Sequence, residues 1–339
     1  MITPSALFEK FKGVSLLNPL CAYTMERCEK IAPQINRILE LKKEKNALIL
    51  AHSYVHPDII YGVADHVGDS YGLAKIGKMA PADLIVFPSV RFMAETVKIL
   101  SPQKTVIDPN PNGGCSLADS IAATQVKELR KKYPKHTFVC YINTTASVKA
   151  ECDVCVTSSN VIQIIEKIPS DKIYFLPDKL MGENAKNLLQ KRGVHKEILT
   201  YPGTCYVHEE FDAGSIDLIR SQNKDALVLA HPECKPEVVA KADVVGSTTQ
   251  MQNFVMQRQK ENRPFVLLTE CGVASRLAME APLARVIGGC TMCKYMRSNS
   301  LASIIEALES PRSSQIIEIE SSTLERASIC LERMFHYAE

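Results

Sequence analysis

Three segments of the chain repeat one pattern, and this repetition limits the possible folds more than any other feature of the sequence. Each copy starts with an apolar run that ends in polar residues: Leu48–Tyr54, Phe138–Asn143 and Leu227–Glu233. Aliphatic runs that do not alternate with polar residues are typical of parallel strands buried on both faces. A short helical stretch and a second small motif follow each run, and an aspartate keeps the copies in register: Asp65, Asp153 and Asp243.

Each copy then continues through a third apolar run to a helix and a last short strand. The third runs are Leu84–Phe87, Ile173–Leu176 and Phe265–Leu268. Because crossovers between parallel strands are right-handed, this order predicts a four-stranded parallel sheet with helices on both faces. We therefore expect an α/β fold of three Rossmann-like αβα domains, related by pseudo-threefold symmetry around a central cleft. The expected domains are residues 1–115, 116–205 and 206–294, with helices in 295–339 packing back on the first.

The composition excludes several classes of protein. The chain has 339 residues, of which 46% are hydrophobic and 23% charged, as expected for a soluble globular protein. A net charge of +2 without a basic stripe argues against nucleic acid as a partner. No apolar segment reaches the roughly 18 residues of a membrane span, and the first residues lack a signal-peptide pattern. We expect a cytoplasmic protein whose 12 cysteines are mostly reduced thiols or metal ligands.

A cysteine stands where each copy ends, at Cys115, Cys205 and Cys293, with spacings of 90 and 88 residues. Equivalent positions on three related domains can converge on one axis. Soft sulfur ligands select iron–sulfur clusters, zinc or copper(I), so three thiolates indicate a [4Fe–4S] cluster with one iron lacking a protein ligand. The same three residues could also be ordinary buried thiols.

Two CxxC pairs, Cys152/Cys155 and Cys290/Cys293, offer other interpretations. Four thiolates can hold a structural zinc ion, although zinc ribbons place their pairs closer together in the sequence. Cys290 and Cys293 could also form a redox pair, in which one thiol regulates a cluster ligand.

Polar side chains follow the first strand of each copy, where open parallel sheets bind ligands. They are His52, Tyr54, Tyr141, Asn143, His231 and Glu233. His231 and Glu233 flank a proline and could form an acid/base pair. Hydroxyl residues precede predicted helices, where they can cap the helix, bind an anion or do both: Ser70, Ser158, Ser247 and Thr248.

With these residues in view, the chain resembles the quinolinate synthase family of iron–sulfur enzymes in NAD biosynthesis. The matching motifs run in order from about residue 45 to 310, and the ordered set is far more specific than any single one. They are Ala51–Tyr54, Gly68–Ser70, Phe92–Thr96, Gly114–Ala118, Tyr141–Asn143, Thr157–Asn160, Pro177–Lys179, Gly203–Glu209, His231–Cys234, Gly246–Thr248, Thr269–Glu270, and Cys293 with Met296.

The resemblance implies condensation of iminoaspartate with dihydroxyacetone phosphate to quinolinate, with release of phosphate and two waters. It implies that Cys115, Cys205 and Cys293 hold a [4Fe–4S] cluster whose fourth iron is open to substrate. Cys293 is preferred to Cys290 because the family's ligand stands three residues before a methionine, here Met296.

The resemblance also assigns the remaining site residues. It implies substrate binding and proton transfer by His52, Tyr54, Tyr141, Asn143, His208, His231 and Glu233. We expect Glu233 to be the principal base, with His231 and Tyr141 orienting the two condensing molecules. It further implies that phosphate and carboxylate oxygens are held by Ser70, Ser158, Ser247 and Thr248.

The chain departs from the family pattern at Val55, where glutamine is common, and at Lys294, where proline is usual. Both departures affect the expected positioning of substrate rather than the reaction. An aspartate oxidase or dehydrogenase would supply iminoaspartate, and iron–sulfur assembly proteins would supply the cluster, because no fused sulfur-transfer domain is present.

Two other functions stay open at this point. A three-thiolate cluster with an open iron could serve a hydro-lyase acting on a small hydroxy acid. The cluster and Cys290 could instead form a switch in an iron–sulfur or redox sensor that turns over nothing.

Overall fold

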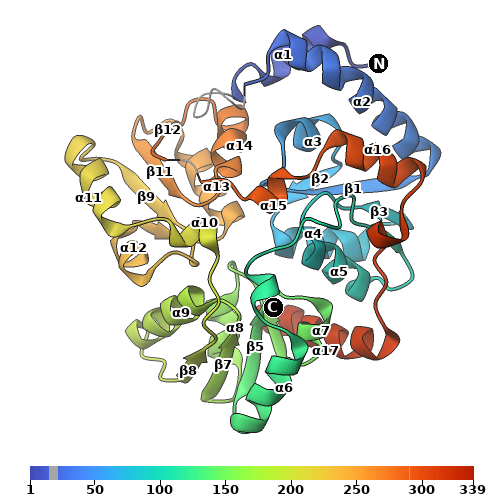
Figure 1. The fold of residues 1–339 in the computed structure, drawn as a ribbon. Helices are drawn as coiled ribbons and strands as arrows, with labels where there is room; N and C mark the ends of the chain where they lie inside the picture. The colour runs from blue at the N-terminus through green and yellow to red at the C-terminus, as the bar shows by residue number, and fades with distance from the viewer. Residues whose placement is uncertain (15–21, 290) are drawn as a thin grey trace.

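Three four-stranded sheets form the body of the protein in the computed structural model, which describes residues 1–14, 22–289 and 291–339 (Figure 1). The first sheet contains β1 (Ala47–His52), β2 (His66–Gly68), β3 (Leu84–Val86) and β4 (Thr105–Ile107). The second contains β5 (Thr137–Tyr141), β6 (Val154–Val156), β7 (Lys172–Leu176) and β8 (Glu197–Thr200). The third contains β9 (Leu227–Ala230), β10 (Val244–Val245), β11 (Pro264–Leu268) and β12 (Arg285–Ile287).

The three sheets share one topology. Their orders are β2-β1-β3-β4, β6-β5-β7-β8 and β10-β9-β11-β12, and the strand pairs within them are parallel. The second strand of each repeat lies at one edge, and the first strand lies inside the sheet. The predicted α/β fold with three parallel sheets is therefore confirmed.

Helices cover both faces of the sheets. The first repeat has α1 (Pro4–Phe11), α2 (Met25–Glu44), α3 (Pro57–Gly62), α4 (Ser70–Met79) and α5 (Arg91–Leu100). The second has a 3₁₀ turn η3 (Ala118–Ser120), then α6 (Ala123–Lys132), α7 (Ala146–Lys149), α8 (Val161–Lys167) and α9 (Lys179–Lys191). The third has α10 (Tyr206–Glu209), α11 (Ala213–Gln222), α12 (Pro236–Lys241), α13 (Thr248–Arg258) and α14 (Gly272–Glu280). The chain ends with α15 (Lys294–Arg297), α16 (Leu301–Glu309), a 3₁₀ turn η4 (Ser313–Gln315) and α17 (Ser321–Ala338).

The recurring aspartates have the same structural task in each repeat. Their carboxylates accept a backbone N–H from the first strand at 2.7–2.8 Å; the pairs are Asp65 with Ile49, Asp153 with Phe138 and Asp243 with Val228. Each carboxylate also forms an ion pair with a positively charged side chain on the helix before that strand: Lys42, Arg130 and Arg220. The aspartate thus satisfies a backbone donor and fixes the start of the sheet, which explains its recurrence.

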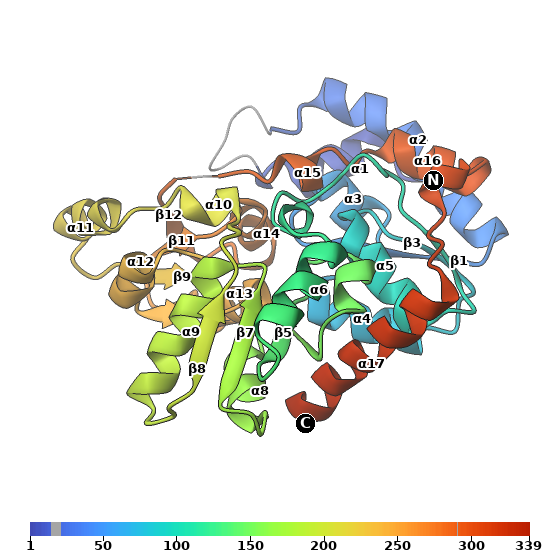
Figure 2. The same cartoon turned by 60° about the horizontal axis from the view of Figure 1, so that its bottom comes forward.

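The C-terminal helices pack on two repeats. Helix α16 lies along α2 of the first repeat, whereas α17 packs against β6, α7 and α8 of the second repeat and α5 of the first (Figures 1 and 2). Residues 295–339, expected to pack on the first repeat, thus contact both the first and the second repeat. The buried face of α17 is apolar and covers the second sheet: Ala327, Cys330, Leu331 and Met334.

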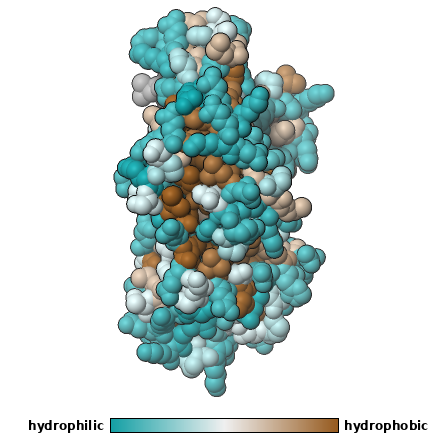
Figure 3. Space-filling view, turned by 90° about the vertical axis from the view of Figure 1, so that its right-hand side faces the viewer, coloured by the Kyte–Doolittle hydropathy of each residue, from teal (hydrophilic) through white to brown (hydrophobic). Residues whose placement is uncertain are grey.

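Much of the face drawn in Figure 3 is hydrophilic. Figure 3 shows the side with the first repeat and the C-terminal helices. An apolar strip runs along the middle of this side, and hydrophilic residues lie on both sides of the strip. Among the described residues, no helix combines the length and the hydrophobicity that a membrane crossing requires.

Candidate active site

One central cavity brings together side chains from all three repeats, as the shared cleft predicts. Every sequence-predicted site residue except Ser247 lines it. These are His52, Tyr54, Ser70, Cys115, Tyr141, Asn143, Ser158, Cys205, His208, His231, Glu233, Thr248 and Cys293. Many of them stand at or just after the carboxyl end of a first strand, and the three sheets direct these ends toward the common centre.

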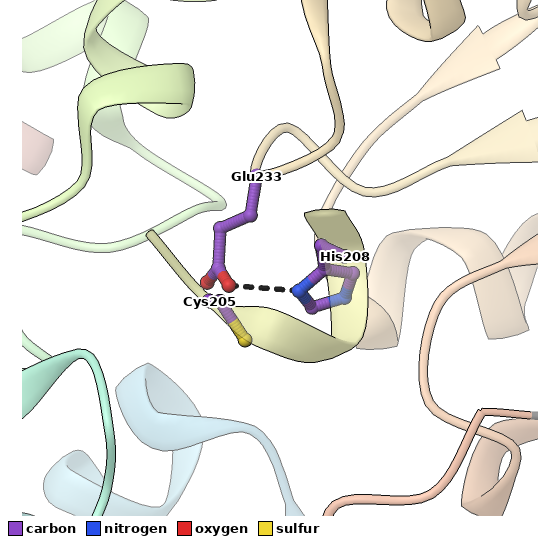
Figure 4. A group of neighbouring side chains, drawn as sticks. All are labelled: Cys205, His208 and Glu233. Carbon is purple, nitrogen blue, oxygen red and sulfur yellow. Dashed lines mark hydrogen bonds and ion pairs between the residues drawn. The ribbon is translucent and has the colours of Figure 1, made fainter. Parts of the chain in front are cut away.

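Glu233 is the central acid of the cavity. Its side chain, in the loop after β9, accepts a hydrogen bond from the hydroxyl of Tyr141 at 2.6 Å and one from Nδ1 of His208 at 2.8 Å (Figure 4). Burial alone would raise the pKa of this carboxyl. The imidazoles of His208 and His231 and the two hydrogen bonds outweigh burial and lower its pKa to about 2. Glu233 is therefore a carboxylate at neutral pH.

A continuous chain of hydrogen bonds leads away from Glu233. The second ring nitrogen of His208 lies 3.0 Å from the hydroxyl of Thr269. That hydroxyl lies 3.1 Å from the hydroxyl of Tyr54, which in turn lies 2.8 Å from the hydroxyl of Thr248. Because hydroxyl groups both donate and accept, these hydrogen bonds couple the protonation of neighbouring side chains.

His52 and His231 repeat one local geometry in two repeats. In each case Nδ1 of the histidine accepts the backbone N–H of the residue two positions later, Tyr54 or Glu233, at 3.2 and 3.4 Å. Burial lowers the pKa of His52 to about 4, and burial with the charge of His208 lowers that of His231 to about 3. Both imidazoles are therefore neutral near pH 7 and carry their proton on Nε2, where it can be donated to a ligand.

The helix starts differ from the sequence prediction by one or two residues. The N-caps of α4, α8 and α13 are Asp69, Asn160 and Ser247, so Ser70 and Thr248 are first helical residues and Ser158 precedes its cap. Ser247 is 1% exposed and is not among the residues that line the cavity; its hydroxyl accepts the backbone N–H of Gln250 and donates to the carboxylate of Asp69. The hydroxyls of Ser70, Ser158 and Thr248 do line the cavity.

The three thiols expected to bind a metal centre all reach the cavity. Cys115, Cys205 and Cys293 are partly exposed, whereas the other free cysteines in the described part of the chain are buried. Burial raises the pKa of Cys115 to about 12, and the neighbouring Cys293 adds to the shift. Protonated thiols that face a cavity and interact with one another suit a metal cluster, since a bound cation ionises its sulfur ligands.

A mononuclear metal site is a narrower possibility. Sγ of Cys205 and ligand atoms of His208 and Glu233 lie within 4.8 Å of one another (Figure 4). However, His208 already uses one ring nitrogen for Glu233 and the other for Thr269. A single ion bound by His208 would have to replace one of these hydrogen bonds.

The structure argues against the alternative interpretation, a zinc site made of two CxxC pairs. Cys152 and Cys155 are buried in the second repeat, where they contact Cys140, whereas Cys293 lines the cavity. Cys293 is a free thiol. Cys290, the other member of the redox pair considered from the sequence, lies outside the described residues. Cys271, for which the sequence indicated no role, is disulfide-bonded.

Three further residues, Thr269, Glu270 and Asn184, support the site, although the sequence indicated no role for them. Thr269 links His208 to Tyr54, as described above. The buried carboxylate of Glu270 accepts the backbone N–H of Cys293 at 3.3 Å and Nε of Arg297 at 3.4 Å. Thr269 and Glu270 form one of the motifs that match the family. That match is the sequence signal that could have identified them as site residues.

Asn184 acts from a different repeat. Its Nδ2 on α9 donates to the carbonyls of Pro232 and Cys234, on either side of Glu233, at 2.9 and 2.7 Å. Nothing in the local sequence distinguishes Asn184 from a surface asparagine. Only the packing of α9 against the loop after β9 reveals its contact.

The strand ends of a parallel α/β fold here carry a buried carboxylate, neutral imidazoles, tyrosines and thiols in one cavity, which defines the active site of an enzyme. The family model described as "Quinolinate synthetase A protein" matches residues 36–336. The chain belongs to this family, whose enzymes act in NAD biosynthesis.

Named relatives agree with the family match. The chain is 42% identical over 330 residues to quinolinate synthase 2 of Mesorhizobium japonicum, covering 95% of this chain and 99% of that protein. It is 41% identical over 307 residues to the quinolinate synthase of Caulobacter vibrioides, covering 89% and 81% of the two chains. It is also 41% identical over 305 residues to that of Xylella fastidiosa, covering 90% and 87%.

Proposed function

We propose that this enzyme condenses iminoaspartate with dihydroxyacetone phosphate to quinolinate, releasing phosphate and two waters. The observation that carries the proposal is the single cavity in which an ionised Glu233, proton-donating tyrosines and three thiols meet. An aspartate oxidase or dehydrogenase would supply iminoaspartate, and iron–sulfur assembly proteins would load the metal centre.

Proton removal is assigned to Glu233. Forming a carbon–carbon bond next to an imine requires loss of a proton from carbon, and a buried carboxylate can accept it. The hydrogen bonds from Tyr141 and His208 hold the carboxylate in one orientation. Hydrogen bonds through His208 and Thr269 connect the carboxylate of Glu233 with the hydroxyl of Tyr54.

Proton donation is assigned to the tyrosines and the neutral histidines. Burial raises the pKa of Tyr54 and Tyr141, so both hydroxyls keep their protons at neutral pH. A leaving hydroxyl or phosphate oxygen needs such a donor. The Nε2–H groups of His52 and His231 can hold substrate oxygens while the proton moves.

The anionic groups of both substrates match the helix starts in the cavity. Ser70 and Thr248 are the first residues of α4 and α13, where backbone N–H groups and the helix dipole favour phosphate and carboxylate. Asn143 and Ser158 supply further polar contacts from the second repeat.

The metal centre is assigned to Cys115, Cys205 and Cys293 as ligands of a [4Fe–4S] cluster. When bound, a cluster with an open iron supplies a Lewis acid for hydroxyl or carboxylate oxygens of the substrate. The carboxylate of Glu270 accepts the backbone N–H of Cys293 and so helps to position this ligand.

The test is an anaerobic purification followed by iron and sulfide analysis and turnover of freshly generated iminoaspartate with dihydroxyacetone phosphate. We expect about four iron per chain and formation of quinolinate. The change Cys205→Ser should abolish both, whereas Cys28→Ser, at a buried thiol on α2, should leave the cluster in place. Zinc or a single iron in place of the cluster, with no quinolinate, would refute the proposal. Dehydration of a hydroxy acid without the second substrate would instead indicate a hydro-lyase.

A further inference from the structure

A second group of cysteines lies outside the active site. Cys140 on β5, Cys155 on β6, Cys152 just before β6 and Cys330 on α17 come together under the C-terminal helix. All four are free and buried. None of the four lines the active-site cavity, so the proposed reaction gives these thiols no role.

Cys140 is the centre of this thiol cluster. Its thiol contacts those of Cys152, Cys155 and Cys330, and its Sγ lies 3.6 Å from Sγ of Cys330. Cys155 faces Cys140 in the strand register, but its thiol also points to the carbonyl of Val156. Cys330 is thus the thiol placed most directly against Cys140.

The surroundings favour a thiolate at Cys140. Burial opposes the charge, but hydrogen bonds from the three other thiols and the positive charge of Lys149 together hold the pKa of Cys140 well below its ordinary value. Nζ of Lys149 is itself fully buried and donates to backbone carbonyls, including that of Ile142 at 2.8 Å. The pKa of Cys330 is raised by burial and by Cys140, so it keeps its proton.

We propose that Cys140 and Cys330 are a site of oxidation, where hydrogen peroxide joins them in a disulfide that ties α17 to the second sheet. The Cys140 thiolate attacks peroxide and, with one proton, gives a sulfenic acid and water. The Cys330 thiol then attacks that sulfur, forms the S–S bond and releases a second water. The net reaction of two thiols and one peroxide gives one disulfide and two waters.

The geometry requires only a small movement. A disulfide has an S–S length of about 2.05 Å, so the two sulfur atoms must approach by roughly 1.5 Å. Helix α17 is the element that covers these thiols, and native proteins open locally in units of this kind. Brief loosening of α17 admits a small oxidant that the closed structure excludes. Because Cys140 precedes Tyr141, the bond would also fix the strand that carries a site residue.

The test treats the anaerobically purified holoenzyme with hydrogen peroxide. The protein is then denatured in acid with an alkylating agent and digested without reductant for mass spectrometry. We expect a peptide pair linked through Cys140 and Cys330, formed at least ten times faster than any oxidation of Cys234. Cys234 is an internal control because it is equally buried and its thiol donates to the carbonyl of Leu268.

A variant separates the two chemical steps. In Cys330→Ser the linked peptide should disappear, and dimedone should trap a sulfenic acid at Cys140. Hydrogen exchange in α17 of the wild-type enzyme should slow on oxidation and recover with dithiothreitol. Full alkylation of Cys140 and Cys330 after peroxide, or oxidation of Cys234 at the same rate, would overturn the proposal. These experiments measure cysteine oxidation and amide hydrogen exchange, so their results do not depend on quinolinate formation.

Discussion

Replacing Asn184 tests whether α9 positions the catalytic loop. Asn184→Ala removes two hydrogen bonds, of 2.9 and 2.7 Å, to carbonyls on either side of Glu233. Asn184 is 8% exposed, so water replaces these donors poorly. At about 1 kcal/mol for each bond, with part of the desolvation cost of the carbonyls added, we expect a loss of about 2–3 kcal/mol in unfolding free energy. For a chain of this size that corresponds to a fall in Tm of roughly 3–4 °C.

The effect on catalysis should exceed the effect on stability. A displacement of about 1 Å at a catalytic group can lower the rate by roughly 100-fold. We expect kcat for quinolinate formation to fall by about 10- to 100-fold, with little change in KM and unchanged iron content. The measurement is anaerobic turnover at several substrate concentrations, together with thermal unfolding.

Two controls separate donor loss from general damage. Asn187 lies on the same helix and is exposed, so Asn187→Ala should change stability by less than about 0.5 kcal/mol and leave kcat intact. Asn184→Asp keeps the volume but places an acidic group against two carbonyls, so it should be at least as harmful as alanine. Full activity in Asn184→Asp, or equal effects at both positions, would refute the positioning role.

Three further predictions address the site. Glu233→Gln should lower kcat by about 10²- to 10⁴-fold with the cluster retained, and intact turnover would remove Glu233 as the base. Glu270→Gln weakens the hydrogen bond to the backbone N–H of Cys293, so a chelator should remove iron about 10- to 100-fold faster. An unchanged rate of iron removal would contradict a role of Glu270 in positioning Cys293. His52 and His231 have folded pKa values near 4 and 3, below the ordinary 6.5. The unfolded chain therefore binds more protons below pH 6.5, and each histidine should lower stability by about 2 kcal/mol at pH 5. Urea unfolding at pH 7 and pH 5 measures this loss, and an equal loss in His52→Asn would exclude His52 as a cause.

The sequence by itself determined the repeated architecture. Unbroken apolar runs specify buried parallel strands, and the recurrent aspartates serve the same backbone donors in each repeat. Residues just after such strands collect at one edge of a sheet, which placed His52, Tyr141 and Glu233 in one cavity. These features depend on local pattern and topology, so they can be recognised along the chain.

The sequence was less informative where contacts join distant segments. The zinc interpretation paired Cys152 and Cys155 with the last CxxC motif, but the fold places them beside Cys140 and Cys330. The contacts of α17 with the second repeat were not evident from the sequence for a related reason: an amphipathic helix shows which face is buried but not which surface covers it.

Only the tertiary structure decided which side chains of the site form hydrogen bonds with one another. The path from Glu233 through His208 and Thr269 to Tyr54 joins side chains from separate repeats, and its hydrogen bonds depend on distances of about 3 Å. Asn184 reaches the Glu233 loop across a repeat boundary. The sequence pattern fixes which residues face the centre, whereas domain packing decides which atoms meet there, because a hydrogen bond is lost with a shift of less than 1 Å.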